Sequence, residues 1–434
     1  MHQKQAISVF WFRRDLRLTD NVGLYHALQN ELPVLPLFIF DTNIISELPQ
    51  NDPRVNFIYD SLLKIQSELR DHGSGLIVKK GDPLAVWKNL AKTYHIALIF
   101  TNRDYEPYAI QRDGLVQTWA ETKGIEFNTF KDQVILEPGE VLKDDGKPYT
   151  VYTPFKNKWL VRYKELVHPI KTYNPSLGNV VKFTQDFPTK NELNITGSSI
   201  GVPPLDLSVV PTYKDTRNFP SVHGTSRIGP HLRFGTLGIR SLVKQVVKQE
   251  GTYLSELIWR EFFMQILHYF PRVVNENFKT KYNAVPWRNN QEEFNAWCSG
   301  TTGYPMVDAG MRELNSTGYM HNRVRMITAG FLCKHLLIDW RWGEAYFAKK
   351  LLDYELAANN GNWQWAAGTG CDAAPYFRVF NPTTQIQKFD KQLEYINTWV
   401  PELNTLQYPN PIVEHKFARE RAISTYKEAL NTIA

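Results

Sequence analysis

The hydrophobic pattern of the first third of the chain predicts strands that alternate with helices. Short apolar runs rich in β-branched or aromatic residues are typical of buried strands, and the segments between them have helical spacing. The predicted strands are residues 6–12, 33–40, 75–79 and 97–101, and the clearest predicted helices are 56–69 and 83–94. This alternation predicts a parallel sheet covered by helices on both faces, a fold whose ligands bind at the carboxyl ends of the strands.

The pattern changes twice further along the chain. Between residues 131 and 204, Pro, Gly, Asn, Lys and Ser dominate and the apolar residues lose their periodicity, which indicates a long interdomain linker. From residue 205 onward helical spacing prevails, for example over 256–270, 322–340 and 343–356. We therefore predict an α/β domain at 1–130, a linker at 131–204 and an all-α domain at 205–434.

Composition narrows the class of protein. A chain of 434 residues with 43% hydrophobic and 22% charged residues is typical of a soluble globular protein that needs no disulfide or metal for its core. The three cysteines lack the spacing of a disulfide framework or zinc site. A net charge of +6 permits nucleic-acid binding without establishing it. No signal peptide or membrane-length apolar run is present, so we expect a cytoplasmic monomer.

One stretch of the helical region, Asn359–Pro382, combines unusual features. It is too polar and too rich in Gly and Asn for an ordinary buried helix, yet it contains Trp363 and Trp365 and a following Tyr-Phe pair. On a helix two residues two positions apart diverge by about 200°. One indole can then face an internal site while the other faces the opposite way. Core packing alone rarely requires both, because each Trp is large and needs a partner for its N–H.

This stretch resembles the flavin-contacting segment of the photolyase/cryptochrome family, and the similarity extends over about residues 6–400. The turn Arg13–Asn21 after the first strand would by itself suit a charged loop that caps the next helix. Together with the residues before it, it resembles the opening signature of the family, and Val151–Trp159 resembles a further short motif. The resemblance implies a Rossmann-like antenna domain followed by an all-α FAD-binding domain.

The resemblance also implies an antenna chromophore in the first domain, of folate, deazaflavin or flavin type. The segment Asn102–Glu106 follows the fourth predicted strand, where an antenna contact is expected. Glu106 partly matches a carboxylate that binds a folate antenna. The basic partner of that carboxylate, which the family places in the helical domain, has no clear match near Val274.

A second segment, Gly224–Leu232, has hydroxyl groups and a Gly at a predicted helix start. Such a segment suits a phosphate, and equally suits ordinary N-capping. It resembles the loop that binds the flavin pyrophosphate. The FAD contacts that the resemblance implies are Tyr213, Thr225, Ser226, Arg227, Ile228, Gly229, Tyr253, Arg325, Asp353, Glu355 and Asn359. Among them Arg325 would pair with Asp353 near the flavin ring, Asn359 would face flavin N5, and Glu355 replaces the usual Asp.

Two helical segments carry the candidate substrate contacts. Glu256 and Trp259 are three apart and share a face that should be core, where a charge is costly unless it is used. The alternative is a surface Glu over a half-buried Trp. Asn322 and Met326 are four apart and can reach one pocket, or they begin a helix with a basic, solvated face. The resemblance implies lesion contacts from Glu256, Trp259, Asn322, Met326 and Trp365, and DNA contacts from Arg217, Arg260, Arg323, Arg378 and Gln385.

Three further tryptophans, Trp287, Trp340 and Trp363, match the electron-transfer chain of the family from surface to flavin. Indoles can be oxidised transiently, so a spaced series can relay electrons, whereas core packing explains most Trp in most proteins. Only the match at all three positions favours the relay.

The resemblance thus implies a light-dependent DNA repair enzyme. It would be a lyase that splits cyclobutane pyrimidine dimers in UV-damaged DNA by electron transfer from photoexcited reduced FAD to a flipped-out dimer. The alternatives are a cryptochrome-type blue-light photoreceptor, a photolyase for the six-four photoproduct, and a flavoprotein that moves electrons in the dark. The complete set of lesion contacts and the lack of a long regulatory tail favour dimer repair. No metal is expected.

Overall fold

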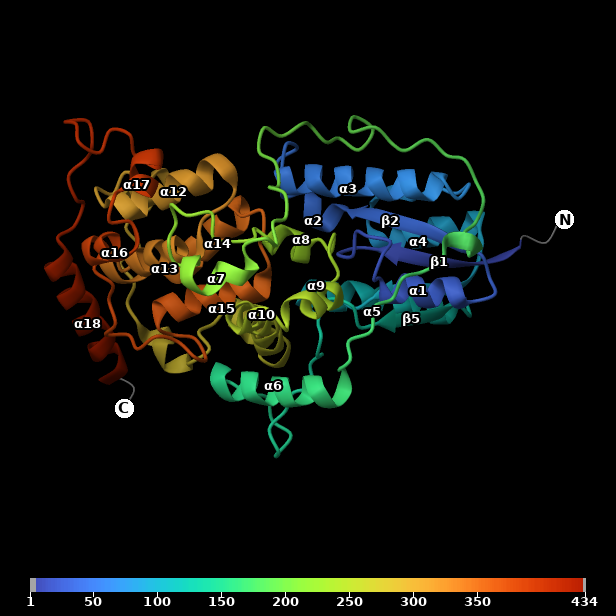
Figure 1. Cartoon of the computed structure of the whole chain (residues 1–434), viewed down its shortest axis with the longest axis horizontal. Coiled ribbons are helices and arrows are strands. Elements are labelled where there is room, and N and C mark those ends of the chain that lie inside the picture. The colour runs from blue at the N-terminus through green and yellow to red at the C-terminus, as the bar shows by residue number, and fades with distance from the viewer. Residues whose placement is uncertain (1–4, 432–434) are drawn as a thin grey trace. The chain divides into compact units, whose positions relative to one another are not determined.

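The structure, a computed structural model, describes residues 5–431 and divides the chain into two compact units, each built from separated stretches (Figure 1). The first comprises residues up to 141 together with 158–204 and 228–248. The second comprises 142–157, 205–227 and everything from 249 onward. The domain limits expected from the sequence, 1–130, 131–204 and 205–434, stay predictions.

The first unit is built on a five-stranded parallel sheet with the order β3-β2-β1-β4-β5. Its strands are β1 Ala6–Phe12, β2 Val34–Asp41, β3 Ile77–Gly81, β4 His95–Asn102 and β5 Glu126–Phe130. The first four confirm the predicted strands to within two residues. The sequence pattern did not predict β5, since this edge strand pairs only with β4 and its residues are exposed or half-buried.

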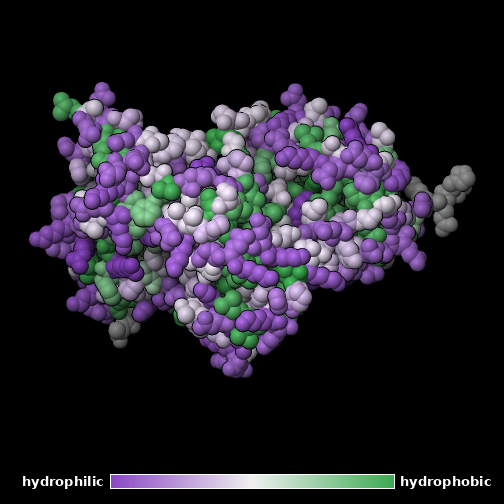
Figure 2. Space-filling view, viewed as in Figure 1, coloured by the Kyte–Doolittle hydropathy of each residue, from purple (hydrophilic) through white to green (hydrophobic). Residues whose placement is uncertain are grey.

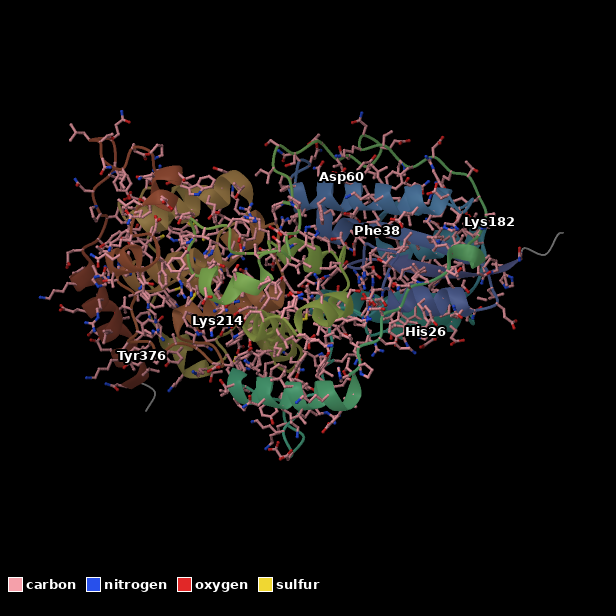
Figure 3. All side chains as sticks on the ribbon, in the orientation of Figure 1. His26, Phe38, Asp60, Lys182, Lys214 and Tyr376 are labelled. Atoms are coloured by element: carbon pink, nitrogen blue, oxygen red, sulfur yellow. The ribbon has the colours of Figure 1, made fainter. Side chains whose placement is uncertain are left out.

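Alternation along the strands divides the apolar side chains of the sheet between two cores. Phe10, Phe12 and Phe38 contribute to a core with α1 (Val22–Gln29) and α3 (Pro53–Arg70). Figure 3 labels Phe38 on β2. The residues between them, such as Trp11, contribute to the opposite core with α4 (Pro83–Thr93) and α5 (Pro107–Thr122). A sheet covered on both faces confirms the predicted α/β architecture, and α3 and α4 confirm the two predicted helices.

A buried network of charges joins residues far apart in the sequence of this unit. Arg240 on α9 (Ile239–Val246) donates to Asp132 at 2.6 Å and to Asp20 at 2.9 Å, and Arg17 donates to Asp132 at 2.7 Å. All four side chains are at most 8% exposed. Burial would raise the pKa of Asp132, but the two guanidinium groups outweigh it and lower that pKa. The stretch 228–248 is thereby fixed to the turn after β1.

Glu106, the candidate antenna contact, is part of a second ion-pair network in the same unit. Its carboxylate lies 2.9 Å from Arg233 and 3.2 Å from Arg14, and Arg14 also pairs with Asp104 at 3.1 Å. Burial opposes ionisation of Asp104, yet the surrounding arginines hold its pKa at about 2. The arginines that pair with Glu106 are therefore Arg14 and Arg233, the latter from α8 (Gly229–Arg233) of the same unit.

The second unit is helical. Its described elements are α7 Tyr213–Thr216, α10 Gly251–Tyr269, α11 Gln291–Ser299, α12 Pro305–Thr317, α13 Asn322–Gly330, α14 Trp340–Lys350, α15 Leu356–Ala367, α16 Pro382–Phe389, α17 Glu394–Trp399 and α18 His415–Asn431, with short turns η2 Val210–Thr212, η3 Pro271–Val274, η4 Thr280–Ala284 and the π-helical η5 Phe331–His335. Outside it, the first unit adds α2 Thr42–Ile45 and η1 Leu177–Asn179, and α6 Tyr152–Leu166 belongs partly to each unit. The predicted all-α second domain is confirmed.

Two predicted helices were too long. The helix expected over 322–340 ends in the π-helical turn η5, and Asp339 caps a new helix, α14, by accepting from the backbone N–H of Arg341 at 3.0 Å. The helix expected over 343–356 stops at Lys350, because the backbone N–H of Leu352 donates to the carbonyl of Gly318. Apolar periodicity runs through both breaks, whereas the local caps decide where the helices end.

Helix α15 corrects the expectation that a polar, Asn-rich stretch is not a buried structural helix. Asn359, Asn360 and Gln364 are all buried. The side-chain amides of Asn360 and Gln364 donate to the carbonyl of Val273, and the Gln364 oxygen accepts from the backbone N–H of Phe278 at 2.8 Å. Hydrogen bonds therefore replace apolar contacts on this side of the helix.

The described surface is mixed in character. Figure 2 shows hydrophilic residues over most of the visible face, with hydrophobic residues in scattered patches. None of the helices in residues 5–431 is long and apolar enough to cross a membrane. The same residues contain no cluster of His, Cys, Asp and Glu suited to a metal ion.

Replacing Arg240 by Met should destabilise the first unit by about 3–5 kcal/mol, because it leaves the buried carboxylate of Asp20 without its guanidinium partner and Asp132 with Arg17 alone. The exposed Lys64 on α3 is the control, since Lys64→Met removes the same charge and should change stability by no more than about 0.5 kcal/mol. Hydrogen exchange of the β1 and β4 amides under urea measures the stability of this unit. Equal effects of the two substitutions would contradict a stabilising role for the network.

Candidate functional site

Helix α10 positions Glu256 and Trp259 on one half-buried face. The helix begins where Glu250 accepts from the backbone N–H of Tyr253 at 2.7 Å. Glu256 is neither core nor free: its side chain is 35% exposed and forms an ion pair with Arg217, which follows α7. The structure therefore brings together one predicted lesion contact and one predicted DNA contact.

Trp259 is held by an aromatic residue that sequence reasoning did not assign. Its ring stacks on Tyr152 with centroids 3.6 Å apart and an angle of 7° between the planes. Tyr152 is itself fixed, because its hydroxyl donates to the carbonyl of Ser255 and its backbone N–H to Asp372. The only signal in the sequence was the short motif at 151–159, which placed Tyr152 without giving it a partner.

Helix α13 carries Asn322, Arg323 and Met326. His321 caps it through Nδ1, which accepts from the backbone N–H of Arg323 at 3.2 Å. Burial and two neighbouring arginines lower the pKa of His321 to about 4, so the ring is neutral and can accept. Asn322 is exposed at the first position, and Met326, one turn later, contacts the Arg323 guanidinium through its sulfur at 3.5 Å.

Arg323 is oriented by Asn218, a second residue that sequence reasoning missed. Its Nη2 donates to Asn218 Oδ1 at 2.6 Å, and its guanidinium lies 4.4 Å from the centre of the Phe389 ring. Burial and the nearby charges of Arg217 and Arg378 lower the pKa of Arg323. Three of the predicted DNA contacts, Arg217, Arg323 and Arg378, are thus close enough to interact. Such a concentration of positive charge favours an anionic ligand.

Hydroxyl groups gather around the predicted pyrophosphate segment. Ser226 and Tyr253 share a hydrogen bond of 2.8 Å, and Thr225 and Tyr319 share one of 3.1 Å. The ring of Tyr213 packs edge-on against that of Tyr253, with centroids 5.0 Å apart. These donors and acceptors suit phosphate oxygens.

The next residues of the segment continue along the chain. Arg227 has a left-handed backbone (φ 51°), and its guanidinium lies 5.1 Å from the Tyr319 ring centre. Ile228 and Gly229 follow directly and begin α8, which belongs to the first unit.

Asp353 and Arg325 form the predicted pair. Arg325 Nη2 donates to Asp353 Oδ2 at 2.9 Å, and its Nε donates to the carbonyl of Met320. The other carboxylate oxygen, Oδ1, is buried and has no hydrogen-bond partner among the described residues. An oriented and otherwise unsatisfied carboxylate oxygen fits an N–H donor such as that of a flavin ring.

Asn359 lies one turn after Glu355, the residue that precedes α15. The amide nitrogen of Asn359 donates to the carbonyl of Glu344 at 3.1 Å and to its carboxylate at 2.8 Å, so the amide oxygen is the atom that can serve a ligand donor. Glu355 is buried and pairs with Arg260 at 3.4 Å. Arg260, a predicted DNA contact, is only 12% exposed in this pair.

The three relay candidates belong to one apolar cluster and differ in exposure. Trp340 and Trp363 are 1% and 2% exposed, whereas Trp287 is half-buried against the same cluster. Trp363 fits tightly, since a side chain added at Gly343 would lie 2.1 Å from its ring. Trp365, on the same helix, is half-buried, as expected for two indoles that diverge around α15.

The remaining predicted contacts lie on other elements. Gln385 is half-buried on α16, and Arg378 is exposed, with its guanidinium 5.6 Å from the Phe380 ring centre. The described contacts link Glu256 with Arg217 and Arg323 with Met326, but they do not link Trp365 or Gln385 to Glu256. The lesion and DNA assignments of these residues stay predictions.

Family models match two parts of the chain. Residues 8–175 match the DNA photolyase model, and residues 253–407 match the model of the FAD binding domain of DNA photolyase. A deoxyribodipyrimidine photo-lyase of Halobacterium salinarum is 37% identical over 98% of this chain and 99% of its own length.

Solved structures of photolyases and a cryptochrome resemble this chain over nearly its whole length. A class III photolyase from Agrobacterium tumefaciens matches with a TM-score of 0.88 and 31% identity, covering 99% of this chain and 98% of its own. A photolyase from Sulfolobus tokodaii with two FAD molecules matches with a TM-score of 0.83 and 35% identity, covering 97% and 99%. A Synechocystis cryptochrome matches with a TM-score of 0.86 and 26% identity, covering 98% and 100%. The chain therefore belongs to the DNA photolyase family, as an enzyme with a parallel α/β domain and a helical FAD-binding domain.

Proposed function

We propose that this protein repairs UV-damaged DNA by splitting cyclobutane pyrimidine dimers in the light. The observation that carries the proposal is the placement of Glu256 and Trp259 on one accessible face of α10, beside the arginines 217, 323 and 378. A carboxylate and an indole suit the N–H groups and the faces of a pyrimidine pair, and guanidinium groups suit the phosphates around it. These residues belong to the unit that carries the FAD-binding domain.

DNA would first engage the arginines through its phosphates. A dimer-containing step stacks poorly, so its extrusion from the helix costs less than that of intact bases. Trp259, held flat by Tyr152, offers a fixed surface for the extruded dimer. Glu256 would accept from a pyrimidine N–H and thereby orient the dimer, and Asn322 would donate to a carbonyl oxygen and thereby stabilise negative charge arriving on the dimer.

FAD, when bound and reduced, supplies the light-driven electron. The chain's own contribution would be to hold and tune it: the unsatisfied oxygen of Asp353 would accept from an N–H of the ring, and the amide oxygen of Asn359 would accept from N5 when that atom is protonated. The hydroxyls of Thr225, Ser226 and Tyr253 would bind the pyrophosphate. Trp363, Trp340 and Trp287 would supply electrons from the surface to oxidised FAD.

The fold does not by itself separate repair from signalling, since a cryptochrome shares it. A second chromophore in the α/β unit stays a prediction, and Glu106, already bound by Arg14 and Arg233, is a weaker candidate for holding it. The monomeric state and the cytoplasmic location likewise stay predictions.

The direct test is light-dependent repair of an oligothymidine that carries a cyclobutane dimer. Purified, photoreduced protein should restore the ultraviolet absorbance of the bases under the lamp and leave it unchanged in the dark. Without recovery, a six-four substrate is tested next. Failure on both, with FAD bound and photoreducible, would favour the signalling alternative. Steady turnover in the dark with a soluble reductant would indicate a flavoprotein that moves electrons without light.

Glu256→Gln should reduce the repair rate by about 10-fold or more, because a hydrogen bond to a charged group contributes about 1.5–3 kcal/mol. The exposed Glu292 on α11 supplies the control, and Glu292→Gln should repair at the wild-type rate. Single-turnover repair of the reduced enzyme measures both. A Glu256→Gln enzyme as fast as wild type would remove this residue from the lesion site.

Trp363→Phe should lose most of the photoreduction of bound FAD while retaining repair once FAD is reduced chemically, because only electron supply passes through the relay. Visible absorption of the flavin under blue light follows photoreduction. Trp399→Phe, a half-buried indole at the end of α17, is the control and should photoreduce normally. If Trp363→Phe photoreduces at the normal rate, the relay is misassigned.

A further inference from the structure

Arg217 and Glu256 face each other although both are expected to contact DNA. Arg217 Nη1 donates to Glu256 Oε1, and the side chains are 29% and 35% exposed. Arg217 directly follows α7, the short helix that Figure 3 marks with the label of Lys214. Its guanidinium also lies 5.6 Å from the Tyr213 ring centre. The pair is therefore formed within the protein but remains accessible to a ligand.

The closed pair competes with both expected contacts. A carboxylate bound by a guanidinium has less capacity to accept from a pyrimidine N–H. A guanidinium neutralised by a carboxylate is a poor ligand for a phosphate, and the carboxylate itself repels the phosphate. If Glu256 contacts the lesion and Arg217 contacts DNA, as expected, both contacts are strongest when the pair opens as the substrate binds.

We propose that Arg217 and Glu256 form a latch that dimer-containing DNA opens. Arg217 exchanges the carboxylate for a DNA phosphate, and Glu256 exchanges the guanidinium for an N–H of the extruded dimer. This inference rests on the proposed function and adds a specificity-determining role for Arg217. The latch makes phosphate binding by Arg217 conditional on the presence of a lesion.

The charges around the pair favour this exchange. Arg323 experiences the like charges of Arg217 and Arg378, and Asn218 holds it in place through a hydrogen bond of 2.6 Å. A DNA phosphate beside these guanidinium groups supplies the negative charge that Arg217 gives up when it leaves Glu256.

The cost of opening falls on Glu256. A half-buried carboxylate that loses its partner is destabilised unless a new donor replaces it. An extruded dimer offers that donor. Intact bases stay stacked and do not, so on undamaged DNA the latch remains closed.

The salt dependence of binding tests the latch, because each phosphate contact adds about 0.9 to the slope of log K against log salt for duplex DNA. Binding of duplexes with and without one cyclobutane dimer is measured in the dark for the wild type and three variants. Arg217→Gln should lower the slope by about 0.9 on dimer DNA and leave it unchanged on undamaged DNA. The control Arg378→Gln, at an exposed position, should lower the slope on both.

Glu256→Gln provides an independent arm, since it frees Arg217 without removing it. Its slope on undamaged DNA should rise by about 0.9, and its preference for dimer DNA should fall. The latch is overturned if Arg217→Gln lowers the slope equally on both duplexes, or if Glu256→Gln leaves undamaged DNA unaffected. A wild type without preference for dimer DNA and without light-dependent repair would overturn the proposed function and the latch together. If the wild type still prefers dimer DNA while the variants give these contrary results, the latch is wrong and the proposed function stands.

Discussion

Hydrogen bonds from buried amides fix helix α15, and much of the second unit depends on them. Asn360 and Gln364 donate to one carbonyl, that of Val273, and Gln364 also accepts from Phe278. Because a buried amide must be satisfied to be tolerated, these bonds specify one position of the helix rather than a range of sliding contacts. Asn359, Trp363 and Trp365 lie on the same helix, so their positions follow from that constraint.

The site is assembled on this frame from charged groups that each retain unused capacity. Arg325 holds one oxygen of Asp353 and leaves the other unsatisfied. Glu344 accepts a hydrogen bond from the side-chain nitrogen of Asn359, so the amide oxygen remains available as an acceptor. In both cases the protein partner orients the side chain, and the remaining oxygen is the atom that we propose binds the flavin. Preorganisation of this kind avoids reorganisation when the ligand arrives.

The hydrophobic pattern of the sequence predicted most strands and helices, because their formation depends on which neighbouring residues are apolar. Four strands were predicted because each contains buried apolar residues in sequence, although in the edge strand β3 that run is short; the other edge strand, β5, has no such run. The helices around 340 and 350 were predicted too long because Asp339 and Leu352 end or restart them through single hydrogen bonds. The spacing of apolar residues contains no information about such hydrogen bonds.

Contacts across the sequence could not be predicted in the same way. The residue types at the site followed from family resemblance, but Tyr152 behind Trp259, Asn218 behind Arg323 and Glu344 behind Asn359 come from other elements. Nothing in the neighbourhood of Trp259 in the sequence points to a tyrosine more than 100 positions earlier. The pairing of Arg260 with Glu355, 95 positions apart, was hidden for the same reason.

The charge network around Asp20 and Asp132 also has a consequence for biosynthesis. A ribosome delivers the sheet first, yet the guanidinium that pairs with Asp20, and that shares Asp132 with Arg17, lies on α9, beyond the first stretches of the second unit. Until residue 240 emerges, the Asp20 carboxylate lacks this partner and is more stable in water than buried. The first unit is therefore completed only after the stretches 142–157 and 205–227 of the second unit have been synthesised.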